Sequence, residues 1–420
     1  LKIEHDKFNG DGRQIEIIRD DPNETTGLTF QQYLGLFGHP GGITESEINF
    51  ERQADNVEFS HNELDNITLT ANTILNDYTL TSISSLVSYE FTEECDCDYV
   101  AAPVFNVDIN EEYEQFSQEL RIVSPLSDTF DWIGGFYFQH SETNFDDRIK
   151  VPSNSILPLA NPALAAIADT SAGRNYTLDS DMWSVFFQGN FHLNEDLTLT
   201  VGARYTEEKK DGHREMNIRE LANSTIGSGD IVSDPSAAIL YDVGFAIQNE
   251  QSSLSPEGHN LTSSRDESSF TPLINVQYKI SNNVMTYVSA STGFKAGGFD
   301  ARGNNIDSWE FEEEEATSFE YGIKSSLLDN TLEVNLAIYR TEYDNLQISQ
   351  FDGTLGFNVG NAKETLVQGL EVDGRWLVLD SDVGTLTMNY AFAYLDHEFL
   401  DFKNGNCYNR QVPDGDIGPG

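Results

Sequence analysis

One short stretch of the sequence has the residue types of a phosphate-binding loop. Residues 286–300 hold a single lysine among glycines, and their central run is Gly293, Phe294, Lys295, Ala296, Gly297 and Gly298. A P-loop needs Gly-Lys-Ser/Thr at its end, and a dinucleotide-binding loop needs G-x-G-x-x-G at the start of a helix. The glycines fit neither spacing, and a loop-like segment follows them. We therefore interpret the run as a strand end, where glycine lets the backbone bend, and not as a catalytic site.

Other residues that could do chemistry are scattered. The sequence contains no G-x-S-x-G, H-E-x-x-H or Walker A pattern, and its eight histidines never pair at metal-ligand spacing. Carboxylate pairs are too common in so acidic a chain to indicate a glycosidase. The sequence therefore predicts no enzyme, no catalytic residue, no cofactor and no metal site.

The three cysteines are Cys95, Cys97 and Cys407. The Cys-x-Cys spacing does not suit a zinc knuckle, and we judge it too close for an unstrained disulfide. Asp96 and Asp98 could bind a metal there adventitiously, but we favour an acidic loop tip. Cysteine usage leaves the redox compartment and the role of Cys407 open.

The charge balance excludes one class of partner. The 420 residues include 70 acidic and 24 basic side chains, a formal net charge of −46. Such a chain repels nucleic-acid phosphates, so we expect no nucleic-acid partner. No run of the roughly 18 apolar residues needed for a transmembrane helix is present. Membrane strands are shorter and alternate in polarity, so they leave a much weaker hydropathy signal.

The elements that must position these residues are β-strands. From Leu197 to Thr206 apolar and polar residues alternate, the segment from Trp183 to Leu193 does the same, and Asn194–Asp196 joins them as a hairpin turn. Two weaker strands are predicted near Ile15–Arg19 and Ile48–Phe59. Five similar hairpins pair Leu64–Thr73 with Asp77–Phe91, Tyr113–Ser124 with Thr129–Thr143, Glu267–Ile280 with Val284–Ala296, Ala316–Leu328 with Thr331–Ser349, and Leu366–Leu379 with Val383–Glu398.

The connections between hairpins are long and polar. They cover Thr92–Glu112, Asn144–Tyr176, Lys210–Asp266, Gly297–Glu315 and Gln350–Lys363. Strict alternation of short and long connections predicts an all-β fold, an antiparallel up-and-down transmembrane barrel with short periplasmic turns, long extracellular loops and about 14 strands. An Ala/Leu-rich stretch within Lys150–Gly173 could form a short helix or a partly ordered loop.

Charges within the strands keep one parity, opposite to an apolar face. Because an ionised group facing the hydrocarbon midplane costs about 2–4 kcal/mol, we expect these charges to face the lumen. Some of them could lie on a ligand path, although structural cross-strand pairing is the commoner role. The predicted lumenal residues are Glu119, Arg121, Arg204, Glu320, Lys324, Glu371, Asp373 and Arg375.

Five segments, in the same order along the chain, resemble TonB-dependent outer-membrane receptors. EYEQFSQELRIVSPLSDTFDWIGGFYF (residues 112–138) is similar to early barrel strands of that family, and GARYT (residues 202–206) to the end of the next hairpin. YVSASTGFKAGGFD (residues 287–300) resembles the family's Y-x-S-x-S-x-G-F-K-x-G-G-F element. ATSFEYGIKSS (residues 316–326) and NVGNAKETLVQGLEVDGRW (residues 358–376) resemble later strands.

The resemblance implies a plugged barrel of about 22 strands in the Gram-negative outer membrane. It implies import of a scarce, large nutrient, most often an iron–siderophore complex, with haem, cobalamin or glycans as other cargo. The implied partners are the TonB energy-transducing complex, membrane lipid and a metal-chelate ligand. No plug domain, TonB-interacting segment or final aromatic strand is found, so we expect residues 1–420 to be part of a barrel domain. The alternatives are a passive porin-like channel and a soluble or adhesive surface β protein.

Overall fold

The computed structural model describes residues 1–13, 15, 17, 20–22, 27–39, 54–221, 232, 237, 240, 259–302, 309–351 and 357–402. Within them, one antiparallel sheet of 13 strands follows chain order, and two short strands pair separately. The large sheet contains β1 (Lys2–Gly10), β2 (Phe59–Leu75), β3 (Tyr78–Cys95), β4 (Asn106–Val123), β5 (Phe130–Val151), β6 (Thr170–His192), β7 (Leu197–Glu220), β8 (His259–Ser281), β9 (Val284–Lys295), β12 (Glu314–Leu327), β13 (Leu332–Phe351), β14 (Phe357–Ser381) and β15 (Gly384–Asp401). The short strands are β10 (Gly298–Phe299) and β11 (Glu310–Phe311).

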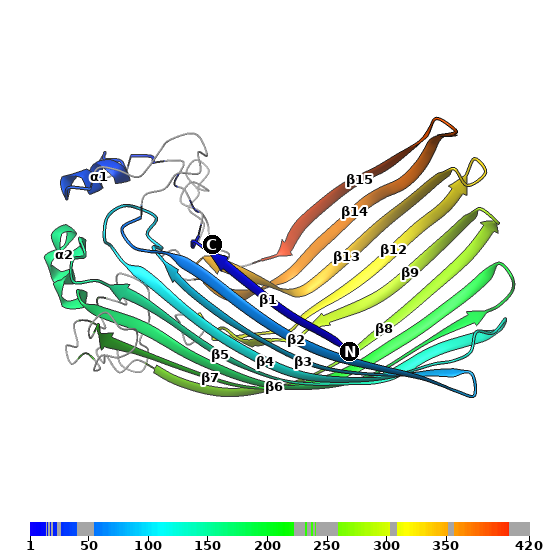
Figure 1. The fold of residues 1–420 in the computed structure, drawn as a ribbon, viewed down its shortest axis with the longest axis horizontal. Coiled ribbons are helices and arrows are strands. Elements are labelled where there is room, and N and C mark those ends of the chain that lie inside the picture. The colour runs from blue at the N-terminus through cyan, green and yellow to red at the C-terminus, as the bar shows by residue number, and fades with distance from the viewer. Residues whose placement is uncertain are drawn as a thin grey trace.

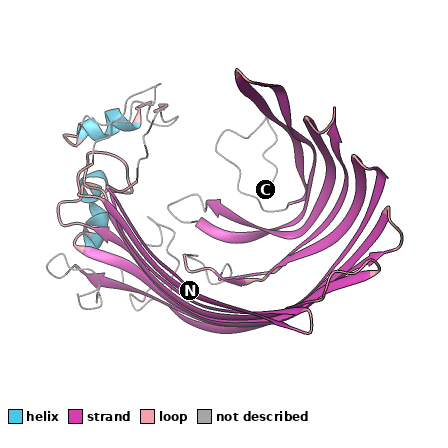
Figure 2. Ribbon diagram, turned by 45° about the vertical axis from the view of Figure 1, so that its right-hand side comes forward, coloured by secondary structure: helices cyan, strands magenta, loops and turns pink. Residues whose placement is uncertain are grey.

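The sheet curls into an open trough (Figures 1 and 2). Each strand pairs with its neighbour in sequence, so the predicted up-and-down order is confirmed. In the described part of the chain, β1 and β15 are the two edges of the sheet, and the wall does not close into a complete barrel. Short turns lie at one end of the strands and the two α-helices at the other (Figure 1).

The short turns depend on residues that tolerate a left-handed backbone. Asn76 and Asp77 form the two-residue turn between β2 and β3 with φ values of 48° and 68°. Asp329 and Asn330 have φ values of 54° and 65° between β12 and β13. Asn and Asp adopt this region more readily than other non-glycine residues, and positive φ at both central residues matches the right-handed twist of hairpin strands. These turns therefore set the hairpin register.

Several strands extend well beyond their predicted ends. β5 continues to Val151 and β6 begins at Thr170, so both ends of the predicted loop Asn144–Tyr176 belong to a strand pair. β7 likewise continues to Glu220, inside the predicted loop Lys210–Asp266. These predictions were wrong because the apolar side chains there, such as Ile149 and Met216, lie on the opposite face from those of the strand middles and stand among charged residues. The alternation is broken while backbone pairing continues.

Near the start of the chain the prediction was also incomplete. β1 was not predicted, and in the predicted strand Ile15–Arg19 the described residues Ile15 and Ile17 are not in a strand. Of the predicted strand Ile48–Phe59, only 54–59 are described, and Phe59 begins β2. Cys407 lies outside the described residues.

Short helices occur only at the end with the long connections, among the described residues. α1 (Phe30–Leu36) begins with a capping box between Thr29 and Gln32. The Ala/Leu-rich stretch forms α2 (Leu157–Ala160) and a 3₁₀ turn over 162–167, so of the two alternatives for this stretch the structure shows the short helix. None of the described helices is long and apolar enough to cross a membrane.

The two faces of the sheet differ in exposure. Large apolar side chains such as Phe136, Phe187 and Val201 are exposed on one face. The other face carries a buried core at the long-connection end, which includes Ile149, Met216 and residues of the connections. An exposed apolar face on one parity and buried or polar residues on the other are the pattern of a membrane barrel wall.

Candidate functional site: the concave wall and its inner hairpin

A short hairpin fixes which face of the sheet is concave. We call residues 297–302 together with 309–311, which contain β10 and β11, the inner hairpin. Its residues contact β6 and β7 through Arg174 and Arg214, and they contact β14 through the backbone of Val359. Only the concave side of a curved sheet brings such distant strands within reach of one hairpin. The face of the sheet that carries the side chains of Arg174 and Arg214 is therefore the concave one, and we say that residues on this face have concave parity.

By strand register, all eight predicted lumenal residues lie on the same face of the sheet as Arg174 and Arg214, the concave one. One group lies on β4 to β7. Arg121 Nη1 is 3.5 Å from Glu119 Oε1, while the Arg204 guanidinium lies 5.8 Å from the centre of the Tyr137 ring and donates to Thr206 Oγ1. The register Arg121–Gly135–Phe186–Arg204 places both arginines in one row. Their contact with a ligand stays a prediction.

The second predicted group lies on β12 to β14. The Tyr287 hydroxyl donates to Glu320 Oε1 at 2.5 Å, and Lys324 Nζ lies 5.8 Å from the centre of the same ring. Asp373 accepts from Asn335 Nδ2 at 2.9 Å. The remaining two residues, Glu371 and Arg375, are paired in register with Ala337 and Glu333. These contacts are local cross-strand pairs, which is the structural role that sequence reasoning also considered.

The glycine–lysine run stands where β9 ends, at Lys295. The Gly297 N–H donates to Glu267 Oε2 at 2.8 Å, and Lys210 Nζ donates to the Gly297 carbonyl at 2.8 Å. Gln347 Nε2 donates to the Ala296 carbonyl at 2.9 Å. A Cβ at Gly297 would lie 2.5 Å from the Phe311 carbonyl oxygen, so this close approach requires glycine.

The structure also brings this run to Arg204. A pocket of about 290 Å³ lies under the run, and its lining includes Arg204, Thr206, Thr271 and Gly293. Sequence reasoning singled out Arg204 and Gly293 separately but gave no sign that they share a pocket. Their proximity depends on the register of β7, β8 and β9, which local patterns do not determine.

The inner hairpin is densely anchored. Arg214 is fully buried, donates from Nη1 to the Asp300 carbonyl at 2.8 Å, and lies 5.1 Å from the centre of the Trp309 ring. Arg174 is paired with Asp147 and donates to the Arg302 carbonyl. Sequence reasoning missed both arginines because they lie in a segment that was predicted to be loop.

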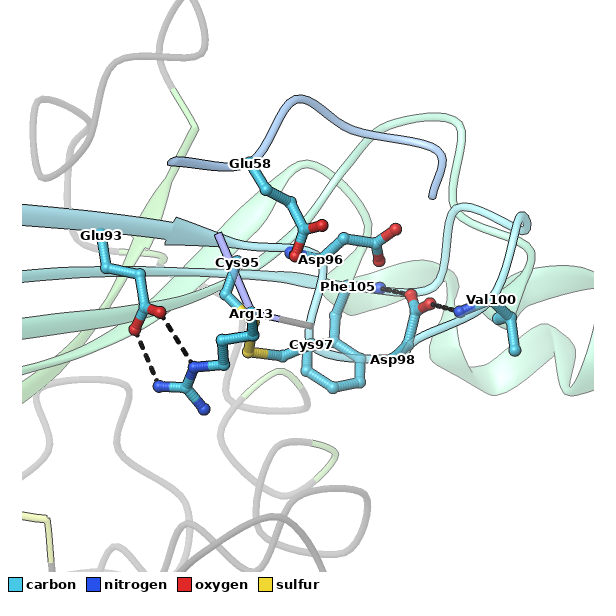
Figure 3. Close-up of a disulfide and its surroundings, with 9 residues drawn as sticks. All are labelled: Arg13, Glu58, Glu93, Cys95, Asp96, Cys97, Asp98, Val100 and Phe105. Atoms are coloured by element: carbon cyan, nitrogen blue, oxygen red, sulfur yellow. Dashed lines mark hydrogen bonds and ion pairs between the residues drawn. A yellow bond between two sulfur atoms is a disulfide. The ribbon is translucent and has the colours of Figure 1, made fainter. Parts of the chain in front are cut away.

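A disulfide joins Cys95 and Cys97 at the end of β3 (Figure 3). The Cys-x-Cys spacing indicated a pair too close for an unstrained disulfide, so the bond was not predicted from the sequence. The chain leaves the strand here and holds the two Cα atoms 5.1 Å apart, within the normal disulfide range. Beside it, Arg13 donates two hydrogen bonds to Glu93, at 3.0 and 2.8 Å. The predicted acidic loop tip is therefore cross-linked by a disulfide.

Asp98 organises the connection that follows. Its carboxylate accepts from the backbone N–H groups of Val100 at 3.1 Å and Phe105 at 3.2 Å (Figure 3). It also accepts from the N–H of Val104 at 3.2 Å. Carboxylate oxygens of Asp55, Asp96 and Asp98 lie within 4.8 Å of one another. Burial, and then the charge of Asp96, raise the pKa of Asp98, and the same two causes raise the pKa of Asp55 to about 6.

A curved antiparallel wall with an exposed apolar face, a charged concave face and an inward-folded hairpin defines a membrane β-barrel. The model of the family described as TonB dependent receptor-like, beta-barrel matches residues 5–416. The chain belongs to this family, whose members are receptors and transporters and not enzymes. It is therefore a wall of an outer-membrane barrel, and its exposed apolar face is the lipid-facing one.

Similar proteins agree with this assignment. The probable TonB-dependent siderophore receptor PiuA of Acinetobacter baumannii is 29% identical over 195 residues, which cover 43% of this chain and 25% of that receptor. Two solved structures share the fold. The ferric yersiniabactin uptake receptor FyuA from Yersinia pestis gives a TM-score of 0.61 at 13% identity, covering 82% of this chain and 44% of FyuA. The siderophore receptor PiuA from Acinetobacter baumannii gives 0.57 at 15% identity, covering 97% of this chain and 55% of that receptor. The chain thus spans at most about half the length of these relatives.

Proposed function

We propose that this chain is part of a receptor that actively imports an iron–siderophore complex across the outer membrane with energy from TonB. The observation that carries the proposal is the family match over nearly the whole chain. The likeness to receptors named for siderophores points to the cargo. The concave wall supports it further, since Arg121 and Arg204 lie in one row beside Tyr137. Planar guanidinium and aromatic groups are suited to an oxygen-rich, anionic chelate.

The acidity of the chain gives these arginines a specific role. A net charge of −46 would repel an anionic chelate at long range. Cations on the concave wall offset that repulsion where a chelate would pass. We propose that they hold the cargo inside the barrel, and that coupling to TonB acts through a part of the receptor outside this barrel wall.

The experiment is growth of the source bacterium under iron limitation with and without the gene. If the proposal is correct, deletion abolishes growth on one ferric siderophore as sole iron source, and the intact gene on a plasmid restores it. Unchanged growth on a panel of hydroxamate, catecholate and carboxylate siderophores would contradict the proposed cargo.

A further inference from the structure

We propose that the inner hairpin is a fixed partition of the extracellular passage, held by Arg214 as a positioning residue, and that it limits the size of cargo that enters. The size limit rests on the proposed import function, whereas the fixed partition does not. The hairpin lies at the end of the barrel with the long connections, beyond the last residue of β9.

The hairpin bridges two parts of the wall that the sheet itself keeps apart. On one side, Arg302 lies 5.3 Å from the centre of the Phe145 ring on β5, and the Tyr176 hydroxyl on β6 donates to the Phe299 carbonyl at 3.3 Å. On the other side, Asp300 Oδ2 accepts from the Val359 N–H on β14 at 2.9 Å. In sheet order, five strands lie between β6 and β14, so the hairpin crosses the concave space and does not follow one strand.

The hairpin is also packed as a core and not as a surface loop. Phe299, Trp309 and Asp300 are all buried, and Phe299 and Trp309 meet edge to face at 5.2 Å. A Cβ at Gly212 on β7 would clash with the Phe299 ring, so the wall has room for that ring only because residue 212 is glycine. Buried apolar contacts of this density indicate a segment that opens rarely.

Hydrogen bonds fix its backbone. The Asp300 N–H donates to the Trp309 carbonyl at 2.7 Å, and the Arg302 N–H donates to Asp300 Oδ1 at 2.9 Å. The Gly297 N–H is held by Glu267, which is itself paired with Arg265 at 2.7 Å. Hydrogen bonds therefore hold the described parts of the hairpin at their start, middle and end.

Arg214 occupies the centre of these contacts. It is fully buried between the Asp300 carbonyl and the face of Trp309, and its charge lies near Arg174, Asp147 and Asp300. A buried cation that bonds a carbonyl and faces an aromatic ring is strongly coupled to both. Removing it would leave the middle of the hairpin without its buried hydrogen bond to β7, with the bond from Lys210 to Gly297 still in place. The lipid-facing surface of β7 would be unchanged.

Hydrogen exchange in the full-length receptor, without cargo, tests the partition directly. We expect the amides of residues 297–302 and 309–311 to exchange as slowly as those of the adjoining strands. Arg214→Ala should speed exchange in these residues by on the order of tenfold or more and leave the periplasmic turns unchanged. Arg219→Ala is the matched control, because Arg219 lies on the same strand with the opposite parity. Fast exchange of the hairpin in the wild type, or no effect of Arg214→Ala, would overturn the proposal.

A second variant tests the proposal even if Arg214→Ala fails to fold. Asp300→Ala removes the bonds to Val359 and Arg302 but keeps the backbone carbonyl that Arg214 contacts, so it should loosen residues 300–302 alone. If this variant exchanges as the wild type does, the bridge to β14 is absent and the proposal fails.

Uptake measurements test the size limit separately. The ratio of initial uptake of a large to a small ferric chelate should rise severalfold in Arg214→Ala. An unchanged ratio with a loosened hairpin would overturn the size limit. If neither chelate enters wild-type cells, the proposed import function fails, while hydrogen exchange still decides the partition.

Discussion

At the scale of single residues, the barrel wall is shaped by side chains that hold backbone. Asp98 binds three N–H groups of the β3–β4 connection, and Glu267 binds one at the end of β9. Both are carboxylates that do no chemistry of their own, and both fix a segment that sequence patterns leave undefined. The acidity of the chain therefore serves partly to order its extracellular side.

The raised pKa values of Asp98, in the β3–β4 connection, and of Asp55, in the segment before β2 that contacts this connection through Asp96, predict greater stability in acid. Because Asp55 and Asp98 have higher pKa values in the folded state than the 3.8 of an ordinary aspartate, the folded connection binds more protons than the unfolded one. The stabilisation that these raised pKa values provide is therefore fully present below about pH 4. It is lost as the pH rises through about 6 for Asp55, and at a still higher pH for Asp98. Limited proteolysis of the receptor at pH 5 and pH 8 should cut residues 96–105 faster at pH 8. Asp98→Asn should reduce that difference, and an equal rate at both pH values would refute it.

Gly297 should tolerate no side chain. Its Cβ would lie 2.5 Å from the Phe311 carbonyl and 2.7 Å from Glu267 Oε1, so Gly297→Ala should push β11 away and destabilise the receptor by about 1–3 kcal/mol. Urea unfolding in lipid vesicles measures this change. Gly384→Ala is the control, because a Cβ there meets nothing within 4 Å. Equal unfolding midpoints for the two variants would show that the turn is not tightly packed.

At the scale of elements, the apolar alternation was the part of the fold that could be predicted. It located the hairpins from β2 to β15, and their order was confirmed. It could not locate the ends of β5, β6 and β7 near the long connections, because their apolar side chains change to the other face and are interrupted by charged residues, which breaks the hydrophobic period. The inner hairpin was beyond prediction for a different reason. Arg214 and Trp309 are far apart in sequence, and only the curvature of the whole sheet brings them together.

A new charge should destabilise the barrel much more on the lipid-facing side of β6 than on its concave side. Phe187 is exposed on the lipid-facing side, so Phe187→Arg should destabilise the barrel by about 2–4 kcal/mol near the bilayer midplane. The adjacent Gln188 has concave parity, so Gln188→Arg should cost much less. Both are measured by urea unfolding in vesicles. Similar losses for the two variants would contradict the assignment of the faces.

At the scale of the whole molecule, the concave row of Arg121 and Arg204 is the proposed holding site for cargo. Loss of a hydrogen bond to a charged group costs about 1.5–3 kcal/mol, so each Arg→Ala change should weaken cargo binding about 10- to 100-fold. Equilibrium binding of labelled ferric siderophore to whole cells measures the loss. Arg340→Ala is the matched control, because Arg340 is half-exposed and paired with Glu342 on the lipid-facing parity. Equal binding by all three variants would remove the arginines from the ligand path.

Energy coupling tests the central claim most directly. The measurement is the initial rate of ⁵⁵Fe–siderophore uptake in cells that carry the full-length receptor, with and without a functional TonB. Active import predicts that uptake falls to background when TonB is removed, while binding to the cell surface persists. Uptake that continues unchanged without TonB would show a passive, porin-like channel and contradict the account.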